Sequence, residues 1–251
     1  MCRKNNLSGG AGENSLDKTV NRMIPKREQI PDYAENKLVK KYYDYIILRK
    51  KSLILKRIFD ILVSILLIII LLLPMIIISF AIKINSKGRV FYKQKRVTQY
   101  GREFFILKFR TMYENSEKQG LLTSNNDPRI TKIGKILRKF RFDEFPQLIN
   151  ILIGDMTFVG ARPEVPKYVE KYTSEMLATL LLPAGLTSIS SINFRNESEY
   201  LENSSDSDKI YLEKILPEKM KYNLEYLRNF SFFLDIKIMF LTFLKVFGIL
   251  R

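Results

Sequence analysis

The longest hydrophobic pattern in the chain is an uncharged run of 22 residues, from Ile61 to Ile82. A helix of that length can span a hydrocarbon core of about 30 Å. Pro74 lies inside the run, where a proline removes one backbone hydrogen bond and kinks the helix. The pattern therefore predicts a bent membrane helix over residues 58–83.

Both flanks of the apolar run are basic. Lysine and arginine favour the cytoplasmic side of a membrane, so each flank favours the same side. We expect a re-entrant helical hairpin that enters, bends at Pro74 and leaves again; an ordinary kinked transmembrane helix is the alternative. The flanking cations are Lys40, Lys41, Arg49, Lys50, Lys51, Lys56 and Arg57 before the run, and Lys83, Lys87, Arg89, Lys93, Lys95, Arg96 and Arg102 after it.

The chain before the run divides into two parts. Residues 1–30 are polar and contain three glycines, which predicts a flexible tail. Residues 31–57 mix tyrosines with lysines and arginines, as juxtamembrane segments do. We do not expect the apolar run to be a secretory signal, because it begins too late and is too long.

From residue 84 onwards the pattern is that of a soluble segment, and we expect residues 84–251 to form a cytoplasmic domain with interfacial helices. Alternating residues indicate strands, and apolar residues at helical spacing indicate amphipathic helices. The predicted fold class is α/β: a small membrane-associated domain with a re-entrant helical hairpin, amphipathic helices and a short β-sheet. The predicted elements are strands over Val90–Gln94 and Phe104–Phe109 with a turn at Gly101, and helices over Ile133–Phe140, Glu144–Ile153 and Phe232–Phe247.

Charge and composition narrow the chemistry. The net charge of +16 predicts attraction to nucleic acid, anionic lipid or a phosphorylated substrate. There is no histidine, which excludes a Ser-His-Asp triad and most zinc sites. Cys2 is the single cysteine, so there is no disulfide framework. Any catalysis must use carboxylates, hydroxyls, cations and a hard ion such as Mg²⁺.

Two adjacent carboxylates, Asp143 and Glu144, follow a stretch with six cations and no acid. Cations can hold a phosphate while a carboxylate attacks it or binds a metal. Residue types alone favour another interpretation, in which the two acids cap the following helix. The six cations are Arg129, Lys132, Lys135, Arg138, Lys139 and Arg141.

The charge also permits a different class of protein, a membrane-tethered, non-enzymatic binder of anionic lipid or nucleic acid. A nucleic-acid binder interleaves its cations with stacking aromatic residues. The 129–141 stretch has only Phe140, and the Asp143–Glu144 pair repels a phosphate backbone. We therefore expect no nucleic acid among the partners.

Several motifs together carry a family resemblance. The stretch from Asp127 to Pro163 resembles the bacterial sugar transferases of the monotopic phosphoglycosyl transferase type, which are polyprenyl-phosphate sugar-1-phosphate transferases. Such enzymes move a sugar 1-phosphate from a nucleotide diphosphosugar, usually a UDP-sugar, to a polyprenyl phosphate. Supporting motifs are Lys56-Arg-Ile-Phe-Asp60, Lys108-Phe-Arg-Thr-Met112 and Leu234-Asp-Ile-Lys-Ile238.

The resemblance implies a role for each acid. Asp143 would attack the phosphate next to the sugar, release UMP and carry the phosphosugar covalently; a carboxylate needs no base for this. Glu144 would help to bind Mg²⁺ or to deprotonate the lipid phosphate. The Mg²⁺ would be held by Asp143 and Glu144.

Other residues acquire expected roles from the same resemblance. Arg162 would grip phosphate bidentately, with a solvated surface arginine as the alternative. Lys108 and Arg110 alternate on a predicted strand, so they would share one face; ordinary exposed strand cations are the alternative. Asp235 lies in an apolar helix, where burial demands a partner such as an arginine, and would support the site from behind. The substrate-binding candidates are Arg162, Lys108, Arg110, Arg141 and Arg195.

The sequence departs from the family pattern at several positions. Ala161 replaces the first proline of a Pro-Arg-Pro motif, and Leu73 replaces the serine of a Ser-Pro pair. Residues 182–195 keep Gly185, Thr187 and Arg195 but lack the family's tryptophan, so the sugar is open.

The expected location is the cytoplasmic face of a bacterial cell membrane. The expected product starts a lipid-linked glycan for capsule, exopolysaccharide or glycoprotein synthesis. Association into a homo-oligomer is left open.

Overall fold

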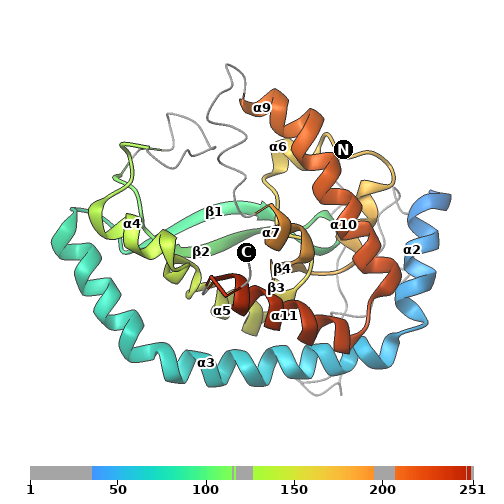
Figure 1. Ribbon diagram of the computed structural model, residues 1–251, viewed down its shortest axis with the longest axis horizontal. Coiled ribbons are helices and arrows are strands. Elements are labelled where there is room, and N and C mark those ends of the chain that lie inside the picture. Colours follow the sequence, from blue (N-terminus) through green and yellow to red (C-terminus); the bar gives the residue numbers. More distant parts are fainter. Residues whose placement is uncertain (1–35, 115, 117–126, 195–206, 247, 250–251) are drawn as a thin grey trace, which may run out of the picture.

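The computed structural model describes residues 36–114, 116, 127–194, 207–246 and 248–249. In this part of the chain, helices surround two small sheets, and one long helix runs along a side of the molecule (Figure 1). Strands β1 (Phe91–Val97) and β2 (Glu103–Phe109) pair antiparallel, and β3 (Met156–Val159) and β4 (Ala184–Thr187) pair parallel. The sequence predicts helices with one short sheet; the residues that the structure describes form two two-stranded sheets.

The apolar run forms one continuous helix, α3 (Lys50–Asn85), which passes through Pro74. Among the described residues, α3 is the helix long and apolar enough to cross a membrane. It bends towards its C-terminal end and has no two antiparallel arms (Figure 1). The bend fits a proline kink, and the re-entrant path stays a prediction. Its most exposed apolar side chains are Leu62, Leu66, Ile69, Ile70, Leu72, Leu73, Ile77, Phe80 and Ile84.

A buried ion pair joins the start of α3 to the last helix, α11 (Phe232–Val246). Lys56 Nζ lies 2.7 Å from Asp235 Oδ2, and both side chains are 3% exposed. The same ammonium donates to Val159 O at 2.7 Å, and the Tyr226 hydroxyl donates to Asp235 Oδ1 at 2.7 Å. The expected partner of Asp235 was an arginine; it is a lysine, and the pair serves to attach α3.

Two further charges of α3 are buried by the domain. The guanidinium of Arg57 covers the C-terminal end of α5 (Gln147–Ile153), and the Asp60 carboxylate accepts from β3. Buried charges are stable only when paired or hydrogen-bonded, so these contacts fix the depth of α3 against the domain. The contacts are Arg57 with Ile151 O at 2.7 Å and Leu152 O at 2.9 Å, and Asp60 with Thr157 Oγ1 at 2.6 Å and Phe158 N at 3.2 Å.

The two strands predicted after the apolar run, with a turn between them, are confirmed as a β-hairpin. β1 and β2 are joined by a short turn, η3 (Gln99–Gly101), in which Tyr100 and Gly101 have positive φ angles of 60° and 73°. The register places Tyr92 opposite Lys108. Lys108 thus lies near the end of β2, next to the start of β1.

The helix predicted over Ile133–Phe140 is confirmed as α4 (Lys132–Lys139). The helix predicted from Glu144 is wrong at its start. A 3₁₀ turn, η5 (Phe142–Glu144), precedes Pro146, and α5 begins only at Gln147. Gly154 ends α5 with a φ of 87°, as predicted.

The segment before α3 folds onto the domain. It forms α2 (Lys37–Ile47), in which Val39, Tyr42 and Ile46 are buried. Tyr42 donates to Glu175 Oε1 at 2.6 Å instead of facing outward. Residues 1–30, the predicted tail, lie outside the described residues.

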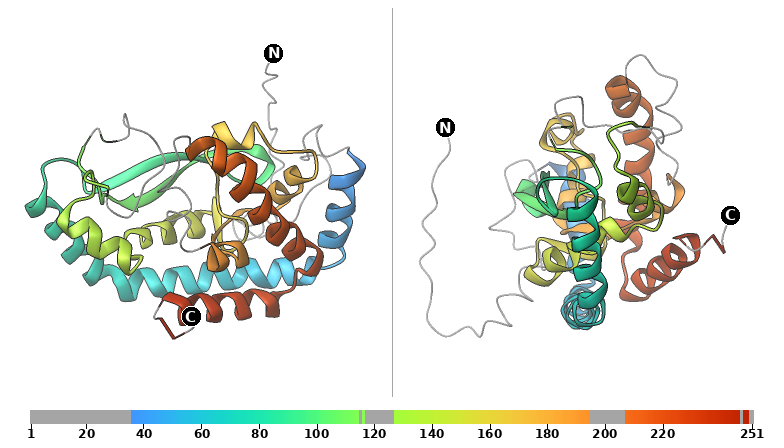
Figure 2. Two further views of the ribbon diagram at one scale, coloured as in Figure 1. Left: turned by 45° about the horizontal axis from the view of Figure 1, so that its top comes forward. Right: turned by 90° about the vertical axis from the view of Figure 1, so that its left-hand side faces the viewer.

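Helix α11 packs against β3 and β4 and lies alongside α3 (Figure 2). The main core contains residues of α2, α3, β2, α5, β3, α10 and α11, and a second cluster lies between α6 and the start of α10. The prediction of a last helix from Phe232 is confirmed. The remaining elements are α6 (Pro166–Val169), η6 (Met176–Leu181), α7 (Ile189–Asn193), α9 (Ser207–Ile210), the π-turn η7 (Tyr211–Ile215) and α10 (Leu216–Asn229).

Candidate active site

The two candidate acids lie in η5, between α4 and α5. Arg141, just before them, has a φ of 60° and a ψ of 20°. Such left-handed geometry costs a non-glycine residue about 1–3 kcal/mol and is concentrated at functional sites. No side chain caps α5, whose N-cap is Pro146. The helix-capping interpretation of Asp143 and Glu144 is therefore wrong.

Three cations converge on one oxygen of Glu144. Arg162 lies 2.7 Å from Glu144 Oε1, Lys108 lies 3.4 Å away and Arg141 lies 3.5 Å away. Burial raises the pKa of Glu144, but the charges of Arg162, Lys108 and Arg141 outweigh it and hold that pKa below its ordinary value. Glu144 is thus an ionised group at the centre of a cationic cluster.

Asp143 has the opposite environment, although it is the next residue. It is buried, and its Oδ1 has no hydrogen-bond partner. Burial raises the pKa of Asp143; nearby Lys108 opposes this and Glu144 adds to it. Buried polar atoms are rarely left unpaired, and those that are require an explanation. A carboxylate oxygen that no donor occupies keeps its lone pairs for a phosphorus atom or a metal ion.

Gln147 lies one turn after Asp143 and is 1% exposed, and its Nε2 also has no hydrogen-bond partner. The two residues are four apart in the chain, with Asp143 in the 3₁₀ turn η5 and Gln147 at the start of α5. Asn150, a turn further on, is satisfied: it donates to Phe105 O at 2.9 Å and accepts from Leu107 N at 3.0 Å. An unpaired donor thus accompanies the unpaired Asp143 oxygen. Sequence reasoning missed Gln147, although its spacing from Asp143 could have suggested it.

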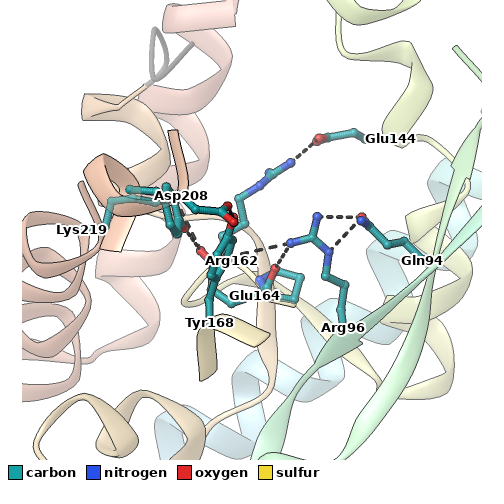
Figure 3. A network of polar contacts seen from close by, with 10 residues as sticks. Gln94, Arg96, Glu144, Arg162, Glu164, Tyr168, Asp208 and Lys219 are labelled. Carbon is teal, nitrogen blue, oxygen red and sulfur yellow. Dashed lines mark hydrogen bonds and ion pairs between the residues drawn. The ribbon is translucent and has the colours of Figure 1, made fainter. Parts of the chain in front are cut away.

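Arg162 is carried by the loop that follows β3. The loop runs close to β4, where Gly160 N donates to Thr187 O at 3.0 Å and Gly185 N donates to Ala161 O at 2.8 Å. A Cβ added at Gly185 would lie 2.2 Å from Gly160 N, so only glycine fits there. This close approach directs the Arg162 guanidinium to Glu144 (Figure 3). The surface-arginine alternative for Arg162 is therefore wrong.

The side chains of Lys108 and Arg110 bind different parts of the structure, which contradicts the prediction that they share one face of a strand. Lys108 points to Glu144, while Arg110 donates to Ser86 O, Ser86 Oγ and Lys87 O, each at 2.8 Å. The strand ends at Phe109, so its alternation does not reach Arg110. Arg110 thus satisfies carbonyls at the C-terminal end of α3.

The remaining candidates divide between the site and its surroundings. Arg141 joins the acids, and Arg138, one of the six cations that precede them in the sequence, lies near enough to Asp143 to lower its pKa. Asp235 belongs to the α3 attachment, and Pro74 lies inside α3. Arg195 lies outside the described residues.

The chemistry of the acid pair fits a hard ion such as Mg²⁺. Among the described residues, no group of three or more carboxylate, cysteine or histidine ligands comes together. Mg²⁺ commonly uses only one or two carboxylates together with substrate phosphates and water. The unpaired Asp143 oxygen is a hard ligand of the required kind.

Known proteins resemble this chain over most of its length. A family described as bacterial sugar transferase matches residues 51–248. The UDP-glucose:undecaprenyl-phosphate glucose-1-phosphate transferase of Klebsiella pneumoniae is 36% identical over 202 residues, 78% of this chain and 41% of that protein. The UDP-N-acetylgalactosamine-undecaprenyl-phosphate N-acetylgalactosaminephosphotransferase of Aeromonas hydrophila is 32% identical over 192 residues, 75% of this chain and 42% of that protein.

A shorter relative matches along most of its own length. The uncharacterized sugar transferase EpsL of Bacillus subtilis (strain 168) is 33% identical over 194 residues, 77% of this chain and 88% of that protein. The chain therefore spans about two fifths of the two longer relatives and most of the shorter one. Asp143, Glu144 and Arg162 all lie within the matched residues 51–248.

Proposed function

The chain belongs to the bacterial sugar transferase family, and from this premise we propose that it transfers a sugar 1-phosphate from a UDP-sugar to a polyprenyl phosphate. The observation that carries the proposal is the contrast within the acid pair. Asp143 keeps a buried carboxylate oxygen without a partner, whereas the adjacent Glu144 is paired with three cations. Asp143 is suited to attack a phosphorus atom, and Glu144 holds three cations beside it.

In the first step, an Asp143 oxygen attacks the phosphorus that carries the sugar. The bond from this phosphorus to the bridging oxygen breaks, and UMP leaves with the electron pair. Asp143 then carries the sugar phosphate as an acyl phosphate. Arg162, Lys108 and Arg141 would turn from Glu144 towards the diphosphate and stabilise the charge that develops on it.

In the second step, an oxygen of the polyprenyl phosphate attacks the same phosphorus. The bond to Asp143 breaks, the carboxylate is restored, and the product is a polyprenyl diphosphosugar. Once the three cations have turned to the phosphates, Glu144 would accept a proton from the lipid phosphate if that oxygen arrives protonated. Splitting one transfer into two displacements is the usual benefit of a covalent intermediate.

Magnesium would be held by the Asp143 and Glu144 carboxylates together with the diphosphate, and would neutralise phosphate charge when bound. The burial that raises the pKa of Asp143 disfavours its charged form. Lys108 opposes that effect, so one role of this lysine is to keep the nucleophile ionised.

The membrane element explains how a lipid substrate reaches these residues. The exposed apolar side chains of α3 suit the hydrocarbon of a bilayer, and α4 packs against α3 while also contacting η5. We propose that the domain lies on the cytoplasmic face, where UDP-sugars are available. The product would begin a lipid-linked glycan.

The test is a transfer assay with the whole chain in lipid nanodiscs. UDP-glucose and UDP-N-acetylgalactosamine are supplied with undecaprenyl phosphate and Mg²⁺, and UMP and labelled lipid are measured. Without the lipid, intact-mass spectrometry should detect one phosphosugar adduct on wild-type protein and none on Asp143→Asn.

A matched control is Asp155→Asn, since Asp155 pairs with Arg102 at 2.8 Å on the hairpin side. This variant should keep the adduct. Turnover that persists in Asp143→Asn would refute the covalent route, and an adduct on a peptide without Asp143 would reassign the nucleophile.

A further inference from the structure

A second polar network lies directly behind Arg162. Glu164, two residues further along the loop, is buried. The Tyr211 hydroxyl donates to Glu164 Oε1 at 2.5 Å, and Lys219 Nζ lies 3.5 Å from the same oxygen. Arg96 NH1 lies 4.0 Å from Glu164 Oε2 (Figure 3). The loop is therefore held through Glu164 by the hairpin on one side and by η7 and α10 on the other.

The backbone of the loop is held from the hairpin side as well. Arg96 NH1 donates to Pro163 O at 3.0 Å, and Val97 N donates to Glu164 O at 2.9 Å. Arg96 is itself fixed by two hydrogen bonds to Gln94 Oε1, at 3.0 and 2.7 Å. None of these bonds uses the Arg162 side chain. The guanidinium thus extends from a backbone that its neighbours hold in place.

Stability alone does not account for these buried charges. They lie beside an apolar cluster of Val165, Tyr168, Tyr211, Ile215, Leu216 and Met220. Replacing a buried ion pair with apolar residues is often neutral or stabilising, whereas a satisfied polar network fixes one geometry. Tyr211 also opens the π-turn η7, a rare geometry that is frequent at functional sites.

The charge state of Glu164 is consistent with a role in holding the loop. Burial raises the pKa of Glu164, but Lys219, Arg96 and the Tyr211 hydrogen bond together bring that pKa below its ordinary value. Glu164 therefore stays ionised at neutral pH and remains attractive to both cations.

We propose that Tyr211 and Lys219 are positioning residues for the transfer reaction: by holding Glu164, they fix the loop that aims Arg162 at the diphosphate. The inference rests on the proposed function and adds a site contribution from η7 and α10. Misplacing a substrate-binding group by about 1 Å can cost up to about a hundredfold in rate. We expect Tyr211→Phe to lower kcat/KM about tenfold, mostly through KM for the UDP-sugar.

A double-mutant cycle separates positioning from general damage. Tyr211→Phe is made in wild-type protein and in Arg162→Ala. If Tyr211 acts through Arg162, it should have little further effect once Arg162 is absent. Equal losses of kcat/KM in both backgrounds, or no loss in wild type, would overturn the inference.

Tyr226→Phe is the matched control. Tyr226 is also buried and also donates its hydroxyl to a buried carboxylate, Asp235, at 2.7 Å. The same hydroxyl lies 3.4 Å from Val159 O, at the end of β3, so this control removes a hydroxyl that touches the strand before the Arg162 loop without passing through Glu164. It should keep the wild-type KM at matched thermal stability. A KM that rises equally in Tyr226→Phe would show that the Tyr211 effect is merely structural.

Lys219 provides a second variant and a rescue. Lys219→Met removes the charge and keeps the chain length, and should raise KM as Tyr211→Phe does, while Lys219→Arg should restore it. Failure of Lys219→Arg to improve on Lys219→Met would count against the ionic contact.

A binding measurement does not depend on turnover. UDP-sugar affinity is measured by calorimetry in the Asp143→Asn background, where Tyr211→Phe should weaken it about tenfold. If wild type forms the adduct and releases UMP while Tyr211→Phe changes neither KM nor affinity, only this inference fails. If wild type neither binds nor turns over a UDP-sugar, the proposed function fails and the inference with it.

Discussion

The Arg162 guanidinium donates to Glu144 Oε1 at 2.7 Å. This hydrogen bond joins the loop after β3 to the 3₁₀ turn η5, and its two residues lie 18 apart in the chain. A phosphate carries the same kind of oxygen that Glu144 presents here. In this structure, the carboxylate therefore holds the arginine in the position where a diphosphate would be bound. The relationship leads to predictions that treat the two acids as unequal.

Asp143→Asn is expected to stabilise the protein. Burial raises the pKa of Asp143, so folding disfavours its ionised form. This group's stabilising contribution is present below the ordinary carboxyl pKa and is lost as the pH rises through the raised pKa. Near neutral pH the variant should unfold at a higher temperature, by about 2–4 °C per 1 kcal/mol, and the difference should vanish in acid. A lower unfolding temperature for Asp143→Asn at neutral pH would contradict this prediction.

Glu144→Gln is expected to have the opposite effect. The charges of Arg162, Lys108 and Arg141 outweigh burial and lower the pKa of Glu144. Its stabilisation is present above the ordinary carboxyl pKa and is lost as the pH falls through the lowered pKa. Near neutral pH, the unfolding temperature measured in nanodiscs should therefore be lower for Glu144→Gln than for wild type. The two acids would be equivalent only if both variants moved the transition in the same direction.

The pH dependence of the first step should report Asp143. Adduct formation requires the ionised carboxylate, so its rate should fall as the pH drops through a pKa above the ordinary value. Lys108 lowers that pKa, so Lys108→Met should move the acid limb to higher pH. Glu144 raises it, so Glu144→Gln should move the limb to lower pH. Single-turnover UMP release measures both shifts, and shifts in one common direction would refute this electrostatic account.

The Lys56–Asp235 pair should be costly to break from one side only. Asp235→Leu leaves the Lys56 ammonium buried without its partner, which typically costs about 3–5 kcal/mol. The double variant Lys56→Met with Asp235→Leu should recover much of that loss. Chemical unfolding of the purified protein measures both. A double variant as unstable as the sum of its single variants would show that the two residues do not interact.

Arg110→Ala should weaken the fold and not substrate binding. Its guanidinium donates to Ser86 and Lys87, at the end of α3. Loss of hydrogen bonds from a charged, buried donor costs about 1.5–3 kcal/mol. The unfolding temperature should fall while KM for the UDP-sugar stays unchanged, in contrast to Arg162→Ala, which should raise KM. A raised KM for the UDP-sugar in both variants would show that Arg110 also contributes to substrate binding.

The sequence predicts what depends on local pattern. The apolar run, the β1–β2 hairpin and α4 follow from periodicity and turn residues. The acid pair needed its family context, because a helix cap explains two acids equally well. The start of α5 was misplaced because Pro146 separates a 3₁₀ turn from the helix.

Other features depend on contacts between distant parts of the chain. Lys56 reaches Asp235 over 179 residues and Val159 over 103, so no local pattern indicates its role. Strands of four residues, such as β3 and β4, are too short for alternation to be recognised. Gly185 was noted as retained from the family, but its close approach to Gly160 is visible only once the two segments are side by side.

The burial of Lys56, Arg57 and Asp60 has a consequence for biosynthesis. The apolar part of α3 leaves the ribosome before residues 151–159 and 235, which supply the partners for these three charges. Until those residues are made, the hydrogen-bond partners that the structure gives these three charges do not exist. We therefore expect the start of α3 to take its final position against the domain only after α11 has been made, so the placement of an early helix depends on residues far along the chain.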